Sequence, residues 1–189
     1  MKKQYRKIVF VTDEDLSPKT ASVRNTYDML ITFASAIITV LVILVFLLRV
    51  VTVQGNSMNP TLNSGDRLVL NSVTSNYEFG DIVVVSRTDD DPLIKRVIGV
   101  GGDTISINYE RGEVFRNGER LEEPYIAAPT YLSYPDGPDF PIVVPEGYLF
   151  VMGDNRNDSL DSRSGDVGLI DENRILGKML IDLNKTEAH

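Results

Sequence analysis

The chain has 189 residues, a formal net charge of −8 and no cysteine. The negative charge argues against a nucleic-acid partner, because binding to phosphates requires a basic surface. The lack of cysteine excludes disulfides, thiol catalysis and cysteine-ligated metals. The single histidine is His189, the last residue, where an ordered catalytic group is not expected. A histidine-based triad and a histidine zinc site are therefore excluded, and a covalent hydrolase would need another base, such as lysine.

Residues 1–28 are polar and are expected to form an irregular tail. An uncharged apolar run follows at 29–48, and its 20 residues span about 30 Å as a helix, which matches a bilayer core. We therefore predict a transmembrane anchor over 29–50. A cleaved signal peptide is the alternative, but its apolar region would be only about 7–15 residues long.

Basic residues predict the orientation of this anchor. Six lysine or arginine side chains precede it within a short tail, so the N-terminus is expected in the cytoplasm. The remainder of the chain, 51–189, would then face the outside as a single extracytoplasmic domain.

This remainder is predicted to be all-β. Short runs rich in β-branched residues recur with glycine and aspartate between them, as is typical of antiparallel strands. The predicted strands are 67–70, 81–86, 93–100, 104–108, 113–116, 141–144, 147–152 and 175–182. Asn117-Gly118 predicts a two-residue hairpin. Residues 125–141 contain four prolines, which indicates a long irregular connection or a surface insertion.

Two residues in this part of the chain suggest nucleophilic chemistry. Ser57 lies among turn-forming residues, although a serine in such a place commonly just stabilises the turn. Lys95 lies in a predicted strand and shares a face with Leu93 and Val97. Apolar surroundings would lower the pKa of Lys95, so that its neutral amine could accept a serine proton. Alternatively, Lys95 extends to water or pairs with an acid.

A third cluster, at 153–163, is dense in hydrogen-bonding groups and follows an apolar strand. It does not fit an EF-hand calcium loop, because basic and apolar residues occupy ligand positions. Two arginines interleaved with three aspartates argue against a simple solvated loop. An ion pair between Asp161 and Arg163 would fix the shape of the loop and hold Ser159 against another polar group.

Four motifs, in this order after one N-terminal anchor, resemble type I signal peptidases over roughly residues 51–178. They are S-M-N-P-T-L at 57–62, G-D-I-V at 80–83, K-R-V-I-G at 95–99, and G-D-N-R with S-L-D-S-R within 153–163. The resemblance implies an antiparallel β-sheet, barrel-like catalytic domain of the signal peptidase type. It also implies a serine endopeptidase with no cofactor and no metal.

The resemblance further implies a Ser-Lys dyad. Ser57 would attack the scissile carbonyl and Lys95 would act as general base. Ser159 would orient the Lys95 amine, as aspartate orients histidine in a triad. The Ser57 amide would help to bind the oxyanion. Some family members add a hydroxyl two residues before the nucleophile, where this chain has Gly55.

Supporting and substrate-binding residues are implied in the same way. Asp161 and Arg163 would hold the last motif in place, and Asp154 would support it. The substrate pocket would lie beside Met58 and Ile94.

The implied substrates are secreted preproteins, cut at the end of their signal peptides by an enzyme that sits in membrane lipid. Because enzyme and substrate would share one thin layer, their effective concentration would be high. The alternatives are a specialised protease for a few surface or pilus proteins, or an inactive relative that assists their assembly. The inactive reading predicts loss of Ser57 or Lys95, and both are present.

Overall fold

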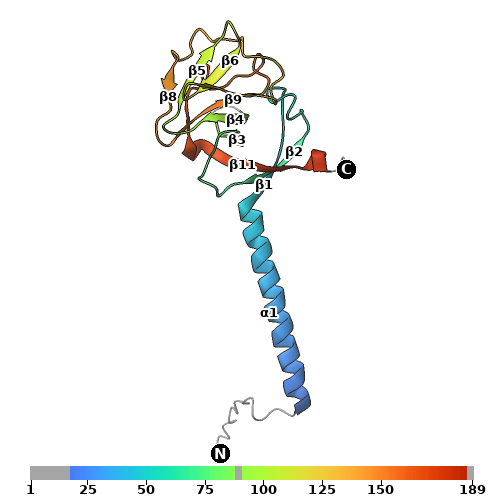
Figure 1. Cartoon of the computed structure of the whole chain (residues 1–189). Helices are drawn as coiled ribbons and strands as arrows, with labels where there is room; N and C mark the ends of the chain where they lie inside the picture. The colour runs from blue at the N-terminus through green and yellow to red at the C-terminus, as the bar shows by residue number, and fades with distance from the viewer. Residues whose placement is uncertain (1–17, 88–90, 187–189) are drawn as a thin grey trace, which may run out of the picture. The chain divides into compact units, whose positions relative to one another are not determined.

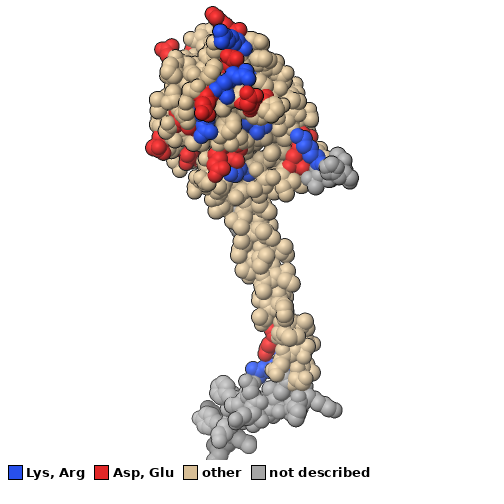
Figure 2. All heavy atoms as spheres, viewed as in Figure 1, with Lys and Arg blue, Asp and Glu red and all other residues tan. Residues whose placement is uncertain are grey.

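A computed structural model describes residues 18–87 and 91–186 of the chain, which divides into two compact units between residues 45 and 46. The described part of the first unit is helix α1 (Pro18–Leu47) up to Val45, shown in blue in Figure 1, and the last two residues of the helix belong to the second unit. The helix segment Ser22–Val45 is long and apolar enough to cross a membrane. The only charged residues of this segment are Arg24 and Asp28, near its N-terminal end, and Figure 2 shows the rest of its visible face without charged side chains.

The bounds of α1 differ from the predicted ones at both ends. The helix begins at Pro18, a residue favoured in the first turn, so residues 18–28 are helical rather than irregular. Residues 1–17 lie outside the described residues. The helix ends at Leu47, and residues 48–50, which the apolar pattern predicts as part of the anchor, belong to a strand.

The second unit is built mainly from a seven-stranded antiparallel sheet with the order β1-β2-β11-β3-β4-β9-β10. Its strands are β1 (Leu48–Thr52), β2 (Arg67–Asn71), β3 (Ile82–Val85), β4 (Leu93–Gly99), β9 (Tyr148–Met152), β10 (Ile170–Asp171) and β11 (Ile175–Asp182). A short 3-10 helix, η2 (Glu172–Arg174), precedes β11, and α2 (Leu183–Thr186) follows it.

A second, four-stranded antiparallel sheet has the order β7-β6-β5-β8 and lies at one end of the β unit (Figure 1). Its strands are β5 (Thr104–Asn108), β6 (Glu113–Arg116), β7 (Glu119–Arg120) and β8 (Ile142–Val143). Asn117 and Gly118 form the predicted hairpin, with φ angles of 55° and 83°. The prediction of a mainly antiparallel β fold after one apolar helix is confirmed.

Three clusters of buried apolar side chains form the core of the β unit. The first includes Met58 and Leu62 from residues 57–62, which we call the serine motif, together with side chains of β2 and β3. The second packs β3 and β4 against β9, and the third fills the space between the two sheets. The serine motif is therefore anchored to the sheet by its own apolar residues.

Strand pairing explains why distant motifs meet. β4 lies between β3 and β9, with Lys95 opposite Val83 and Arg96 opposite Met152. β9 ends at Met152, so the motif that starts at Gly153 leaves the sheet beside β4, the strand that carries Lys95.

Candidate active site

Ser57 is presented by a turn between β1 and β2. The backbone N–H of Asn59 donates to the carbonyl of Asn56, and that of Leu62 donates to the carbonyl of Met58. Met58 and Leu62 are each 1% exposed, so the turn is fixed from inside the core, whereas Ser57 itself is only half-buried. The sequence thus holds the backbone of Ser57 firmly while the residue stays partly exposed.

Lys95 projects from β4 and is 2% exposed. Its Nζ atom lies 2.8 Å from Ser57 Oγ and 3.0 Å from the carbonyl oxygen of Ile94. Burial lowers the pKa of Lys95 from 10.5 to about 8, although the charges of Asp161 and Asp154 oppose this shift. A lysine with this pKa is neutral in about a tenth of molecules near pH 7 and can accept a proton.

Gly153 is the first residue of the last motif and lies against the turn that carries Ser57. A Cβ atom at this position would lie 2.2 Å from Ser159 Oγ and 2.5 Å from the carbonyl oxygen of Ser57, so no side chain fits there. Asn155, two residues on, donates its backbone N–H to the Ser57 carbonyl at 3.0 Å. Its Nδ2 donates to the Asn56 carbonyl at 3.2 Å. The last motif therefore fixes the backbone of Ser57 and Asn56 through hydrogen bonds from Asn155.

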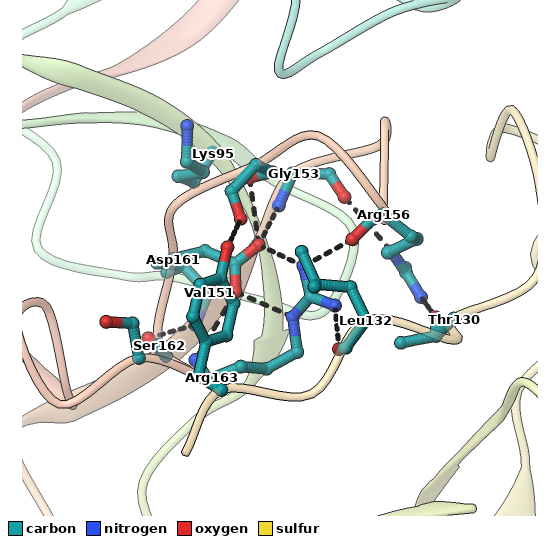
Figure 3. A network of polar contacts seen from close by, with 12 residues as sticks. Lys95, Thr130, Leu132, Val151, Gly153, Arg156, Asp161, Ser162 and Arg163 are labelled. Carbon is teal, nitrogen blue, oxygen red and sulfur yellow. Dashed lines mark hydrogen bonds and ion pairs between the residues drawn. The ribbon is translucent and has the colours of Figure 1, made fainter. Parts of the chain in front are cut away.

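Asp161 organises the rest of the last motif (Figure 3). Both of its oxygens accept from the Arg163 guanidinium, at 2.8 and 2.9 Å, and both side chains are fully buried. Asp161 also accepts from the hydroxyl of Ser159 at 2.9 Å and from the N–H of Gly153 at 3.0 Å. The charge of Asp161 and its hydrogen bonds outweigh the effect of burial and raise the pKa of Arg163. The predicted ion pair is present.

The contact of Ser159 differs from the one we expected. Its hydroxyl proton points to Asp161, and among the hydrogen bonds of the described residues none joins Ser159 to Lys95. The Ser159 oxygen keeps its lone pairs as acceptors, so the predicted orienting role remains a prediction.

Asp154 takes part in a second buried ion pair, with Arg96. The Arg96 guanidinium donates to the two carboxylate oxygens at 2.8 and 2.6 Å and to the Gly80 carbonyl at 2.8 Å. The hydroxyl of Thr61 donates to the same carboxylate. The Asp154 carboxylate thus links the serine motif at 57–62, strand β4 and the last motif at 153–163. The sequence alone does not assign Arg96 or Thr61 a role, because contacts that join a strand to distant loops leave no periodic pattern.

The two residues expected in the substrate pocket lie in different surroundings. Ile94 is half-buried and lines a cavity of about 140 Å³ with Val51, Val84, Leu176 and other residues. Met58 is 1% exposed and packs in the core. The cavity is mainly apolar and adjoins the residue whose carbonyl accepts from Lys95.

Residues 125–141 are irregular, as expected, but they pack on the last motif. Tyr134 donates its hydroxyl to the carbonyl of Ser159, and Arg163 donates to the carbonyl of Leu132 at 3.1 Å. The side chain of Asn157 accepts from the backbone N–H groups of Tyr131 and Leu132. The segment therefore braces the last motif through these hydrogen bonds. Among the described residues, no group of acids or histidines is arranged to hold a metal ion.

A family model described as "Signal peptidase, peptidase S26" matches residues 26–183, which is most of the chain. The chain belongs to the signal peptidase family. The match includes both the polar motifs around Lys95 and the apolar part of α1.

Similar proteins carry the same family name. Signal peptidase I S of Bacillus subtilis is 37% identical over 151 residues, covering 75% of this chain and 80% of its own. Signal peptidase IB of Staphylococcus aureus strain COL is 34% identical, covering 82% of this chain and 88% of its own. A crystal structure of a signal peptidase I from Enterococcus faecalis V583 is 28% identical, with a TM-score of 0.44, and covers 57% of this chain and 98% of that one.

Proposed function

We propose that this signal peptidase is a membrane-anchored serine endopeptidase that removes signal peptides from secreted preproteins. Ser57 is its nucleophile and Lys95 its general base. The observation that carries the proposal is the 2.8 Å separation of Lys95 Nζ and Ser57 Oγ, with the lysine buried. The names of the similar proteins support the substrate class.

In the first half of the reaction, the neutral amine of Lys95 takes the proton of Ser57 as its oxygen attacks the scissile carbonyl. The tetrahedral intermediate places a negative charge on the former carbonyl oxygen, and the Ser57 N–H helps to stabilise it. Lys95 then gives its proton to the leaving amine, which is the N-terminus of the mature protein. The signal peptide remains attached to Ser57 as an ester.

In the second half, Lys95 removes a proton from water as the water oxygen attacks the ester carbonyl. When the bond between the acyl carbon and Ser57 Oγ breaks, Lys95 returns this proton to Ser57 Oγ, and the signal peptide leaves with a free carboxyl group. Lys95 must be neutral at the start of each attack, so its low pKa is part of the mechanism. Ser159 supports the orientation of the amine, while the Asp161–Arg163 pair and Asp154 hold the surrounding loop.

We place α1 in the membrane with the N-terminus in the cytoplasm and residues 51–189 outside, following the excess of basic residues before the helix. A signal peptide is itself a membrane-inserted segment, so confinement in one layer raises the rate of encounter. The substrate binds beside Ile94 in the apolar cavity.

The direct test is cleavage of a purified preprotein by the full-length protein in detergent or lipid vesicles. Mass spectrometry should find one cut, at the end of the signal peptide, and should find a covalent adduct on Ser57 when the acyl-enzyme is trapped. Absence of cleavage, or cleavage that persists without Ser57, would refute the proposal.

A further inference from the structure

Tyr125 is half-buried in the segment 125–141, which packs on the last motif. Its side chain faces β4, the strand that carries Lys95 and Arg96. Its ring lies 4.1 Å from the guanidinium carbon of Arg96 and 6.0 Å from that of Arg156. Its hydroxyl donates to Glu123 at 3.3 Å, and Glu123 accepts from Arg156 in turn. The tyrosine is thus flanked by two arginines from different motifs.

The nearer cation, Arg96, follows Lys95 directly in β4 and lies opposite Met152. Its contacts to Asp154 fix the backbone at the point from which Lys95 extends. Loss of these contacts would therefore loosen the chain next to Lys95, whose amine faces Ser57. An error of about 1 Å in such an alignment can cost a hundredfold in rate.

The Arg96 side chain is 11% exposed and that of Asp154 is fully buried, so water has little access to the pair. A planar guanidinium stacks well on an aromatic face, and the attraction strengthens when the pair is shielded from water. Burial and the charge of Glu123 raise the pKa of Tyr125 to about 12, so the ring remains neutral over any practical assay range. The tyrosine is therefore a constant neighbour of Arg96 that does not titrate.

We infer that Tyr125 is a positioning residue for the reaction: it stacks on Arg96, keeps the Arg96–Asp154 pair dry, and thereby fixes the Lys95 amine against Ser57. The inference rests on the proposed Ser-Lys function. It assigns a catalytic effect to a side chain that contacts neither member of the dyad in any interaction of the described residues.

The first test compares three variants of the full-length protein on a preprotein substrate, with rates normalised to active sites by titration of Ser57. Tyr125→Leu should lower kcat about tenfold and leave KM within about twofold, because cation–π stacking is lost but the substrate cavity is unchanged. Tyr125→Phe keeps the stacking face and should retain kcat within about twofold. Tyr131→Leu removes a tyrosine of the same segment that is 54% exposed, and should leave kcat unchanged.

Fluorinated phenylalanines at position 125 provide a second test that does not depend on the fold of the leucine variant. Fluorination weakens the negative face of the ring and hardly changes its shape, so kcat should fall stepwise from phenylalanine to pentafluorophenylalanine. Equal kcat values across this series, or a defect confined to KM in Tyr125→Leu, would overturn the inference. If the wild-type protein cleaves no preprotein, the proposed function fails instead, so the two failures are distinguishable.

Discussion

The Nζ atom of Lys95 lies 2.8 Å from the Oγ atom of Ser57, although 38 residues separate the two in the chain. The lysine comes from the middle of the sheet and the serine from a turn anchored by Met58 and Leu62. This distance is that of a hydrogen bond, so a proton can pass between the two groups without rearrangement. In the proposed mechanism, the protonation state of Lys95 therefore controls the rate of the reaction.

The pH dependence of cleavage follows from the pKa of Lys95, about 8. Protonated Lys95 cannot accept the serine proton, so activity should rise with pH and level off above that value. We expect kcat/KM, measured between pH 6 and pH 10, to follow one ionisation with a midpoint near 8. A flat profile, or a midpoint close to the ordinary lysine value of 10.5, would contradict this assignment.

Burial of charged Lys95 should also lower the free energy of unfolding near neutral pH. Its pKa is 10.5 when unfolded and about 8 when folded, so the unfolded state binds more protons between these values and stability rises with pH there. Below pH 8 the full cost applies, about 3 kcal/mol. Lys95→Met should be inactive yet more stable at pH 7, by about 1–3 kcal/mol after its lost hydrogen bonds are counted.

The measurement is thermal unfolding of the full-length protein in detergent at several pH values. The advantage of Lys95→Met should shrink toward pH 10. Lys178 is a suitable control because it pairs with Asp81 and its side chain is 24% exposed. Lys178→Met should not stabilise the protein at any pH in this range. If Lys95→Met is less stable than wild type at pH 7, burial of the charged amine does not destabilise the protein as proposed.

Asp161→Asn should destabilise the protein strongly. The substitution leaves the Arg163 guanidinium buried without its carboxylate, which typically costs about 3–5 kcal/mol. Glu122→Gln is the control, because Glu122 and Arg120 form an ion pair in which their side chains are 85% and 53% exposed. This substitution should change the free energy of unfolding by less than about 0.5 kcal/mol. Denaturant midpoints of the two variants give the comparison, and similar losses in both would show that Asp161 does not anchor the loop.

Gly55 lies two residues before Ser57, at the position where the family resemblance implies a possible hydroxyl donor to the oxyanion. It has a φ of +82°, and a Cβ there would meet no atom within 4 Å. Gly55→Ser and Gly55→Ala should therefore lose the same stability, about 1–2 kcal/mol, from the backbone alone. If the hydroxyl binds the oxyanion, Gly55→Ser will have the higher kcat of the two. Equal kcat values would show that no donor is missing at this position.

Sequence patterns predicted most of the strands, because β-branched runs between glycine and aspartate turns depend on local physics. The predicted hairpin at Asn117-Gly118 already implied β7 as its second arm, but the patterns missed β1, which directly follows the apolar helix, and β10, which has two residues. They also missed the contacts of Thr61 and Tyr125, since hydrogen bonds and ring stacking between segments distant in the sequence depend on tertiary packing. The hydroxyl of Ser159 illustrates the same limit: its motif predicted a buried polar contact, but only the fold selects Asp161 as the partner.

The most direct test of the dyad is single-turnover cleavage of one preprotein by wild type, Ser57→Ala and Lys95→Ala at equal concentrations of folded protein. Removing either group should lower the rate by at least about a thousandfold, because nucleophile and base act as a unit. The double variant should then be no slower than either single one. Cleavage by either single variant at a rate within about tenfold of wild type would contradict the account.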